Sequence, residues 1–201
     1  RILMYNYLSF PSNRSNDPTA YYSEEELFTP NEIDWILLNQ NQVPFETATI
    51  AADRKEENEM RKSQIKWLRY DQYPDFYWIY NRLQTAIERA NSTFWNFNLY
   101  TMPEHIQYTE YYAGGGHYDW HMDIGPQELS TRKVSITVQL SDPNEYEGGD
   151  LEIFRSPHPE KAPRGYGSVV VFPSYMMHRV TEVTKGVRKS LVLWVGGESY
   201  K

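Results

Sequence analysis

The sequence predicts one domain of mainly antiparallel β-structure, a sandwich or barrel, with helices packed against one side. Its length of 201 residues is within the usual size of a single domain. Two segments in the first half have helical periodicity, whereas the second half alternates short apolar segments with turns rich in Gly, Pro, Asn and Asp. We therefore expect residues 1–94 to form a support region of helices and strands, and residues 95–201 to form the β core.

The first predicted helix begins at a capping box. Thr29 stands at the N-cap, Pro30 at the first helical position and Glu32 at the position whose side chain returns to the N-cap backbone. Apolar residues follow at helical spacing: Ile33, Ile36 and Leu37. A helix starting at Thr29 is therefore expected.

The second predicted helix begins near Pro74 and has a longer apolar stripe. Its apolar residues recur every three or four positions: Phe76, Ile79, Tyr80, Leu83, Ile87 and Ala90. Between the two helices, residues 53–62 are charged and lack any period. We expect a solvated loop there, and a substrate lid is the alternative interpretation.

Eight short strands are predicted in the second half of the chain: residues 95–101, 104–112, 117–123, 133–140, 150–155, 167–172, 176–183 and 187–195. Their close spacing, with no helical pattern between them, is typical of an antiparallel sandwich or barrel. The order of helices first and strands afterwards predicts that the helices cover one side of this barrel.

Composition excludes several classes of function. The net charge of -7 argues against binding to nucleic acid or anionic lipid through bulk charge. With no cysteine, the chain can have no disulfide, Fe–S cluster, zinc–cysteine site or thiol nucleophile. No apolar run reaches the length of a membrane span or a signal-peptide core. We therefore expect a cytoplasmic protein without nucleic-acid or membrane partners.

The residues best suited to chemistry lie between positions 117 and 123. His117 with Asp119, and His121 with Asp123, form two overlapping His-x-Asp pairs. Side chains two residues apart share one face of a strand, so both pairs are expected on the same face. With a histidine from another strand, either pair would complete a 2-His-1-carboxylate site that leaves part of the Fe(II) coordination sphere open. A hydrogen-bonded surface pair is the alternative.

His178 is the candidate third ligand. It begins a predicted strand 55 residues after Asp123, a separation that a barrel closes through space. Ten residues further, Arg188 and Ser190 share a strand face. Their guanidinium and hydroxyl groups suit bidentate binding of a dicarboxylate, and an exposed strand-edge cation is the alternative for Arg188.

His121, Asp123, His178 and Arg188, in this order and spacing, resemble the Fe(II)/2-oxoglutarate-dependent dioxygenases, most closely the prolyl 4-hydroxylase-like branch with its PKHD-type hydroxylases. The resemblance covers residues 104–196, with weaker similarity around Arg61-Lys62-Ser63. It includes further motifs: Tyr112, Tyr118, residues 134–143, Gly148-Gly149, Pro173-Ser174 and Thr184-Lys185-Gly186. It implies a double-stranded β-helix, or jelly roll, and favours the second His-x-Asp pair.

The resemblance also implies a role for each site residue. His121, Asp123 and His178 would bind iron. The distal carboxylate of 2-oxoglutarate would bind Arg188, Ser190 and the Tyr112 hydroxyl. The implied lining of a peptide groove is Tyr118, Arg132 and Trp194, and the alternative for Tyr118 and Trp194 is a packing role in the barrel core.

The implied reaction is hydroxylation of a substrate C–H bond with O2, releasing succinate and CO2 from 2-oxoglutarate, with ascorbate as a candidate additional cofactor. A prolyl residue of a peptide or protein is the expected substrate, and a free small molecule is an alternative. Two other classes stay open: a non-catalytic jelly-roll module that binds peptide or sugar, and a metal-dependent isomerase or hydrolase. The oligomeric state cannot be inferred from the sequence.

Overall fold

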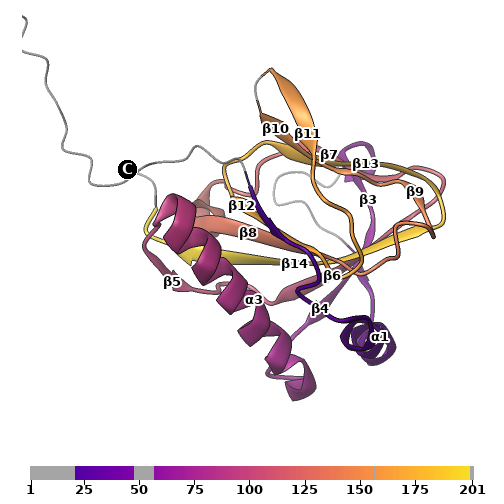
Figure 1. Ribbon diagram of the computed structural model, residues 1–201, viewed down its shortest axis with the longest axis horizontal. Helices are drawn as coiled ribbons and strands as arrows, with labels where there is room; N and C mark the ends of the chain where they lie inside the picture. The colour runs from indigo at the N-terminus through magenta and orange to yellow at the C-terminus, as the bar shows by residue number, and fades with distance from the viewer. Residues whose placement is uncertain (1–20, 48–56, 156, 200–201) are drawn as a thin grey trace, which may run out of the picture.

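The structure, a computed structural model, describes residues 21–47, 57–155 and 157–199. Two antiparallel sheets form its β core (Figure 1). The strands of the larger sheet are β1 (Tyr22–Glu24), β2 (Glu46–Thr47), β4 (Gln64–Leu68), β5 (Leu99–Thr101), β6 (Ile106–Tyr112), β8 (Arg132–Gln139), β12 (Val169–Pro173) and β14 (Val187–Gly197). They are ordered β1–β12–β8–β14–β6–β4–β2, with β5 paired to β14.

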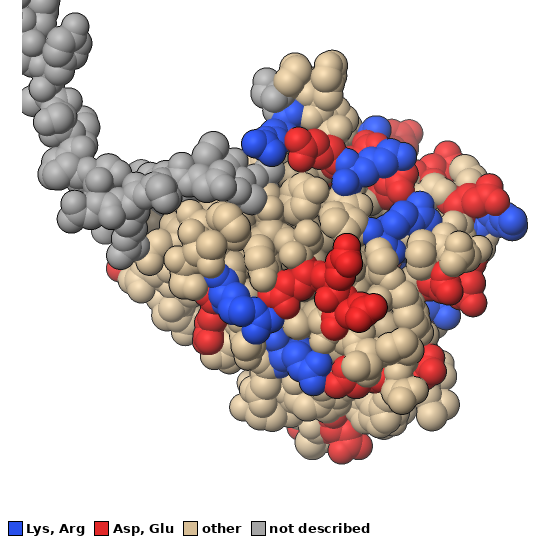
Figure 2. All heavy atoms as spheres, in the orientation of Figure 1, with Lys and Arg blue, Asp and Glu red and all other residues tan. Residues whose placement is uncertain are grey.

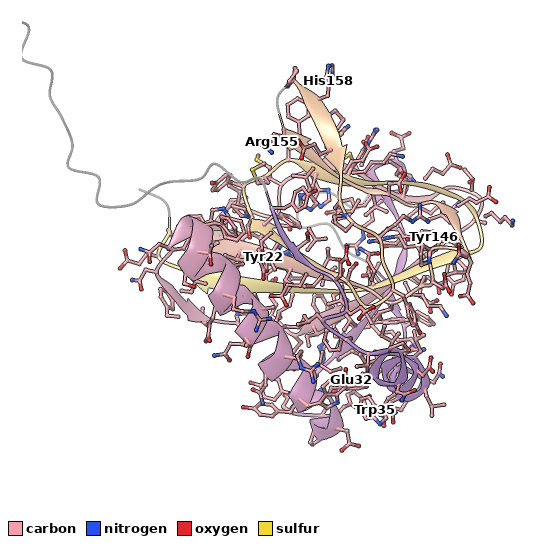
Figure 3. The ribbon with its side chains drawn as sticks, viewed as in Figure 1. Tyr22, Glu32, Trp35, Tyr146, Arg155 and His158 are labelled. Carbon is pink, nitrogen blue, oxygen red and sulfur yellow. The ribbon has the colours of Figure 1, made fainter. Side chains whose placement is uncertain are left out.

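The smaller sheet packs against the inner face of the larger one. Its strands are β3 (Arg61–Lys62), β7 (Gly116–His121), β9 (Glu147–Gly148), β10 (Leu151–Arg155), β11 (His158–Lys161) and β13 (His178–Lys185). Their order is β11–β10–β13–β7–β3, with β9 paired to β13. The β10–β11 hairpin projects from the body, and Figure 3 labels Arg155 and His158 near its tip. Apolar residues of both sheets, among them Tyr111, Phe172 and Val183, form the core between them.

The two predicted helices are confirmed. Helix α1 (Pro30–Asn39) begins at the capping box, in which the Glu32 backbone donates to Thr29 Oγ1 and the Thr29 backbone donates to the Glu32 carboxylate. Helix α3 (Tyr77–Ala90) follows a 3-10 turn (Pro74–Phe76) and buries the whole predicted stripe.

Both helices lie on the outer face of the larger sheet, as predicted, and α3 crosses it diagonally (Figure 1). Outward-facing residues of the larger sheet, such as Ile136 and Leu193, share their core with the helices. An ion pair of 2.8 Å between Arg82 of α3 and Glu32 of α1 joins the helices, and Figure 3 labels Glu32. Because the helices occupy the outer face, the inner face is left to the barrel interior.

Acidic and basic side chains alternate on the surface of the helical side, as Figure 2 shows. Arg89 of α3, for example, pairs with Glu24 of β1 at 2.7 Å. Among the described residues, no helix combines the length and the apolar character needed to cross a bilayer.

Residues 57–62 differ from the predicted loop. They form a helical turn, α2 (Glu57–Met60), and strand β3, in which Arg61 and Lys62 pair with Tyr118 and His117 of β7. Residues 53–56 lie outside the described residues. The loop prediction failed because this strand is stabilised by a distant partner, whereas its local sequence is charged and aperiodic.

The remaining differences concern short elements. The first predicted strand, residues 95–101, is shorter in the structure: a π-helix (Asn91–Trp95) includes its first residue, and β5 is restricted to residues 99–101. Strands β1, β2, β4, β9 and β11 were not predicted. Except for β4, they are two to four residues long, too short for a periodic pattern to be recognised.

Candidate active site

Three side chains of the smaller sheet meet on the inner wall of the barrel. His121 ends β7, Asp123 follows two residues later and His178 begins β13. Their candidate ligand atoms lie within 4.8 Å of one another, and within the described residues no other such group of three is found. The Nε2 atoms of His121 and His178 lie 3.6 and 3.5 Å from the Asp123 carboxylate. Strand register creates the group, because β7 and β13 pair His121 directly with His178.

Backbone carbonyls fix the orientation of both imidazoles. His121 Nδ1 lies 2.7 Å from the Asp119 carbonyl oxygen, and His178 Nδ1 lies 2.8 Å from that of Met176. A carbonyl only accepts, so each Nδ1 carries the proton and donates. Each Nε2 therefore has its lone pair available on the Asp123 side, as a metal ligand requires.

The carboxylate is also held in place. Ser135 donates its hydroxyl to Asp123 Oδ2 at 2.6 Å, and the Asp123 backbone donates to the Ser174 carbonyl. Burial alone would raise the pKa of Asp123, but the neighbouring histidines and the Ser135 hydrogen bond lower it well below its usual value. Burial lowers the pKa of His178 to about 4. At neutral pH the site therefore presents a carboxylate and a neutral imidazole, the protonation states that bind metal.

A β-bulge in β7 distinguishes the two His-x-Asp pairs. His121 lies opposite His178, and Tyr118 lies opposite Val180. Two residues of β7 thus face one residue of β13, which interrupts the alternation of side chains. As a result, Tyr118 and His121 both point into the barrel although they are three residues apart.

The expectation that both pairs share one face is therefore wrong. His117 lies outside the group and contacts the carbonyl oxygens of Gly115 and Glu59 at 2.7 and 2.8 Å. Asp119 is exposed and accepts a hydrogen bond from the next backbone N–H. Only the second pair, His121 and Asp123, contributes to the group that the structure assembles.

Arg188 is a buried cation on the inner face of the larger sheet. It is 2% exposed, and its Nη1 lies 3.5 Å from Ser190 Oγ, so these two residues share a face as predicted. The guanidinium carbon lies 5.5 Å from the centroid of the Tyr111 ring. No carboxylate of the described residues pairs with Arg188. Since an unpaired buried charge is costly, this position is suited to an anionic ligand.

The structure corrects the position of Tyr112. Arg188 pairs across the sheet with Tyr111, and the next residue, Tyr112, points to the opposite face. There the Tyr112 hydroxyl donates to Glu110, and the side chain is 41% exposed. Tyr111, which the sequence analysis missed, lies on the Arg188 side and is 3% exposed. The sequence spacing alone could not identify it, because the choice depends on the register between β6 and β14.

The three residues assigned to a peptide groove lie near the His–Asp–His group. Tyr118 stacks on His121, with ring centroids 3.5 Å apart and planes 13° apart. Burial raises the pKa of Tyr118 to about 12. Arg132 forms an ion pair with Glu104, and its Nη1 donates to the Asp123 carbonyl at 3.1 Å.

Trp194 lies on the inner face of β14, opposite Ser135. The Arg132 guanidinium carbon is 4.0 Å from its ring centroid. Trp194 is 7% exposed, and its buried Nε1 finds no hydrogen-bond partner in the described residues. Because a buried indole N–H normally has an acceptor, this orphaned donor is suited to a ligand carbonyl.

These features define a class of site: a β-barrel with two histidines and one aspartate suited to a metal on the smaller sheet, and a buried arginine suited to an anion on the larger. Residues 106–196 match the sequence model of the 2OG-Fe(II) oxygenase superfamily. Through this segment the chain is similar to that superfamily.

A curated relative, a PKHD-type hydroxylase of Teredinibacter turnerae, is 37% identical over 101 residues, which cover 47% of this chain and 45% of that protein. The chain thus spans about half the length of the curated relatives it matches.

Solved structures share the fold over most of the chain. A prolyl hydroxylase from Trichoplax adhaerens, in complex with a peptide fragment of the hypoxia-inducible factor oxygen degradation domain, gives a TM-score of 0.74 at 18% identity and covers 89% of this chain and 84% of that one. HygX from Streptomyces hygroscopicus, with nickel and 2-oxoglutarate bound, gives 0.66 at 12% identity, covering 89% and 83%. At these identities the likeness establishes the fold, and the predicted jelly roll is confirmed.

Proposed function

We propose that this protein is an Fe(II)- and 2-oxoglutarate-dependent oxygenase that hydroxylates a prolyl residue of a peptide or protein, releasing succinate and CO2. The observation that carries the proposal is the buried Arg188, which pairs with no carboxylate in the part of the chain that the structure describes and lies on the sheet that faces the His–Asp–His group. A binding module or a metal-dependent hydrolase has no need of a buried cation at this position.

In this proposal the iron ligands are His121, Asp123 and His178. Two neutral imidazoles and one carboxylate suit Fe(II) and leave coordination positions for cosubstrate and O2. Bound iron would supply the oxygen chemistry, with ascorbate as a candidate reductant. The protein holds the three ligands in place: backbone carbonyls orient the imidazoles, and Ser135 orients the carboxylate.

The proposed 2-oxoglutarate pocket is formed by Arg188, Ser190 and Tyr111. The guanidinium would bind the carboxylate remote from the metal, since its planar fork matches a carboxylate in two-point geometry. Tyr111 replaces Tyr112 in this role, because only Tyr111 shares the inner face with Arg188.

The proposed substrate subsite is lined by Tyr118, Arg132 and Trp194. The aromatic faces of Tyr118 and Trp194 suit an apolar ring, and the unpartnered Trp194 Nε1 suits a backbone carbonyl of a peptide. The Trichoplax neighbour, solved with a peptide, supports a peptide in preference to a free small molecule.

Turnover separates this function from its alternatives. With Fe(II), O2 and 2-oxoglutarate, we expect succinate release together with a product one oxygen atom heavier when Pro-containing peptides are screened by mass spectrometry. If no peptide is oxidised but a small molecule is, the peptide assignment is wrong. If 2-oxoglutarate is not consumed with any substrate, the protein is a binding module or another metalloenzyme.

The assignment of the second His-x-Asp pair makes a separate prediction. His121→Ala should abolish Co(II) binding measured by calorimetry, because it removes one of three ligands. His117→Ala is the matched control and should bind Co(II) as the wild type does, because its imidazole contacts only backbone carbonyls outside the group. If His117→Ala abolishes Co(II) binding and His121→Ala keeps it, the first His-x-Asp pair binds the metal and the assignment is wrong.

A further inference from the structure

The Tyr118 ring lies between two side chains, His121 and Arg61. One face of the Tyr118 ring stacks on the His121 imidazole at 3.5 Å, and the Arg61 guanidinium carbon lies 4.7 Å from its centroid. The Tyr118 hydroxyl has no hydrogen-bond partner among the described residues. Ring contacts therefore determine how the Tyr118 side chain is held.

Arg61 is itself anchored at two points. Its Nε donates to Ser63 Oγ at 2.7 Å, and its Nη2 donates to Gln107 Oε1 at 2.8 Å. Gln107 is buried on β6 of the larger sheet, whereas Arg61 pairs with Tyr118 in the smaller sheet. The guanidinium thus bridges the two sheets at the edge where the chain passes from β3 to β4. Two hydrogen bonds fix the position of the planar guanidinium, whereas the flexible ammonium group of a lysine could not make both at once.

We propose that Arg61 is a positioning residue for the metal centre: its anchored guanidinium holds the Tyr118 ring flat against His121 and so limits the orientations of this imidazole. The inference rests on the proposed metal centre. Within the described residues, the hydrogen bond that the His121 ring makes to the backbone runs from Nδ1 to the Asp119 carbonyl, and this anchor leaves the ring free to tilt about it. The stacked Tyr118 ring removes that freedom and points Nε2 toward Asp123.

The test is Co(II) binding by Arg61→Met, which keeps most of the apolar side chain and removes the guanidinium. We expect Co(II) affinity, measured by calorimetry, to fall about tenfold, as is typical when a group supporting a metal ligand is removed. We also expect the d–d absorption spectrum of the Co(II)-saturated protein to change, because the His121 ring would tilt. Arg61→Lys keeps the charge without the two-point anchor and should restore affinity only in part.

Lys62→Met is the matched control. Lys62 is the next residue of β3, is exposed and donates to the Gly114 carbonyl, so affinity and spectrum should stay as in the wild type. Gln107→Met removes one hydrogen bond that anchors Arg61 and should also weaken Co(II) binding. If Arg61→Met does not fold, Gln107→Met tests the inference in its place, and wild-type Co(II) affinity of this variant would overturn it.

An Arg61→Met protein with wild-type affinity and spectrum would overturn the inference. Failure of the metal centre itself gives a different result, because the wild type would then bind no Co(II), or His178→Ala would bind it unchanged. Both outcomes are measured by Co(II) binding, so neither depends on enzymatic turnover.

Discussion

Asp123→Ala is expected to abolish both metal binding and 2-oxoglutarate turnover. Asp123 supplies the sole carboxylate of the group and lies within 3.6 Å of both imidazole Nε2 atoms. Loss of a group that merely supports a ligand costs 10–100-fold in metal affinity, so loss of this ligand should cost more than about 100-fold. Co(II) calorimetry and succinate release measure the two effects.

Asp119→Ala is the matched control for this variant. Asp119 lies two residues before His121, is exposed and hydrogen-bonds only to backbone through its carboxylate. It should retain both metal binding and turnover. If Asp123→Ala still binds Co(II) as the wild type does, the His–Asp–His group is not the metal site.

Arg188→Met is expected to lower the affinity for 2-oxoglutarate about 100-fold while Co(II) binding is retained. A hydrogen bond to a charged group contributes about 1.5–3 kcal/mol, and the variant removes a two-point contact of this kind. The variant should also make the ligand-free protein at least as stable as the wild type, because an apolar chain replaces a buried cation that pairs with no carboxylate of residues 21–47, 57–155 and 157–199. Thermal unfolding with and without 2-oxoglutarate measures both effects.

Lys189→Met is the control for Arg188→Met. Lys189 is the adjacent residue of β14 but faces outward, where it lines a hollow together with Asp34 of α1. Its replacement should leave the stabilisation by 2-oxoglutarate unchanged. If Lys189→Met loses this stabilisation and Arg188→Met keeps it, the cosubstrate assignment belongs to Lys189.

Features encoded by local sequence were predictable. The capping box at Thr29 and the apolar stripe of α3 depend on residues a few positions apart, so the sequence shows them directly. The same holds for the longer buried strands β8, β12 and β14. The spacing of His121, Asp123, His178 and Arg188 was sufficient to suggest a common site because it resembles that of a known family.

Features that depend on strand register were not predictable. The bulge in β7 changes which side chains face inward, and this change excludes His117. The pairing of β6 with β14 places Tyr111 beside Arg188, whereas sequence spacing suggested Tyr112. Strand β3, which carries Arg61, forms through a partner 57 residues away and has no local pattern of its own. Each of these depends on a long-range contact that a single sequence does not reveal.

The most direct test is an anaerobic titration of the Fe(II)-loaded protein with 2-oxoglutarate, followed by the visible absorption of the iron–keto acid chelate. If iron and cosubstrate share one pocket between the two sheets, the wild type should develop this charge-transfer band, Arg188→Met should need far more 2-oxoglutarate to reach it, and Asp123→Ala should never develop it. A wild-type protein that binds Fe(II) yet shows no such band at saturating 2-oxoglutarate would contradict the account.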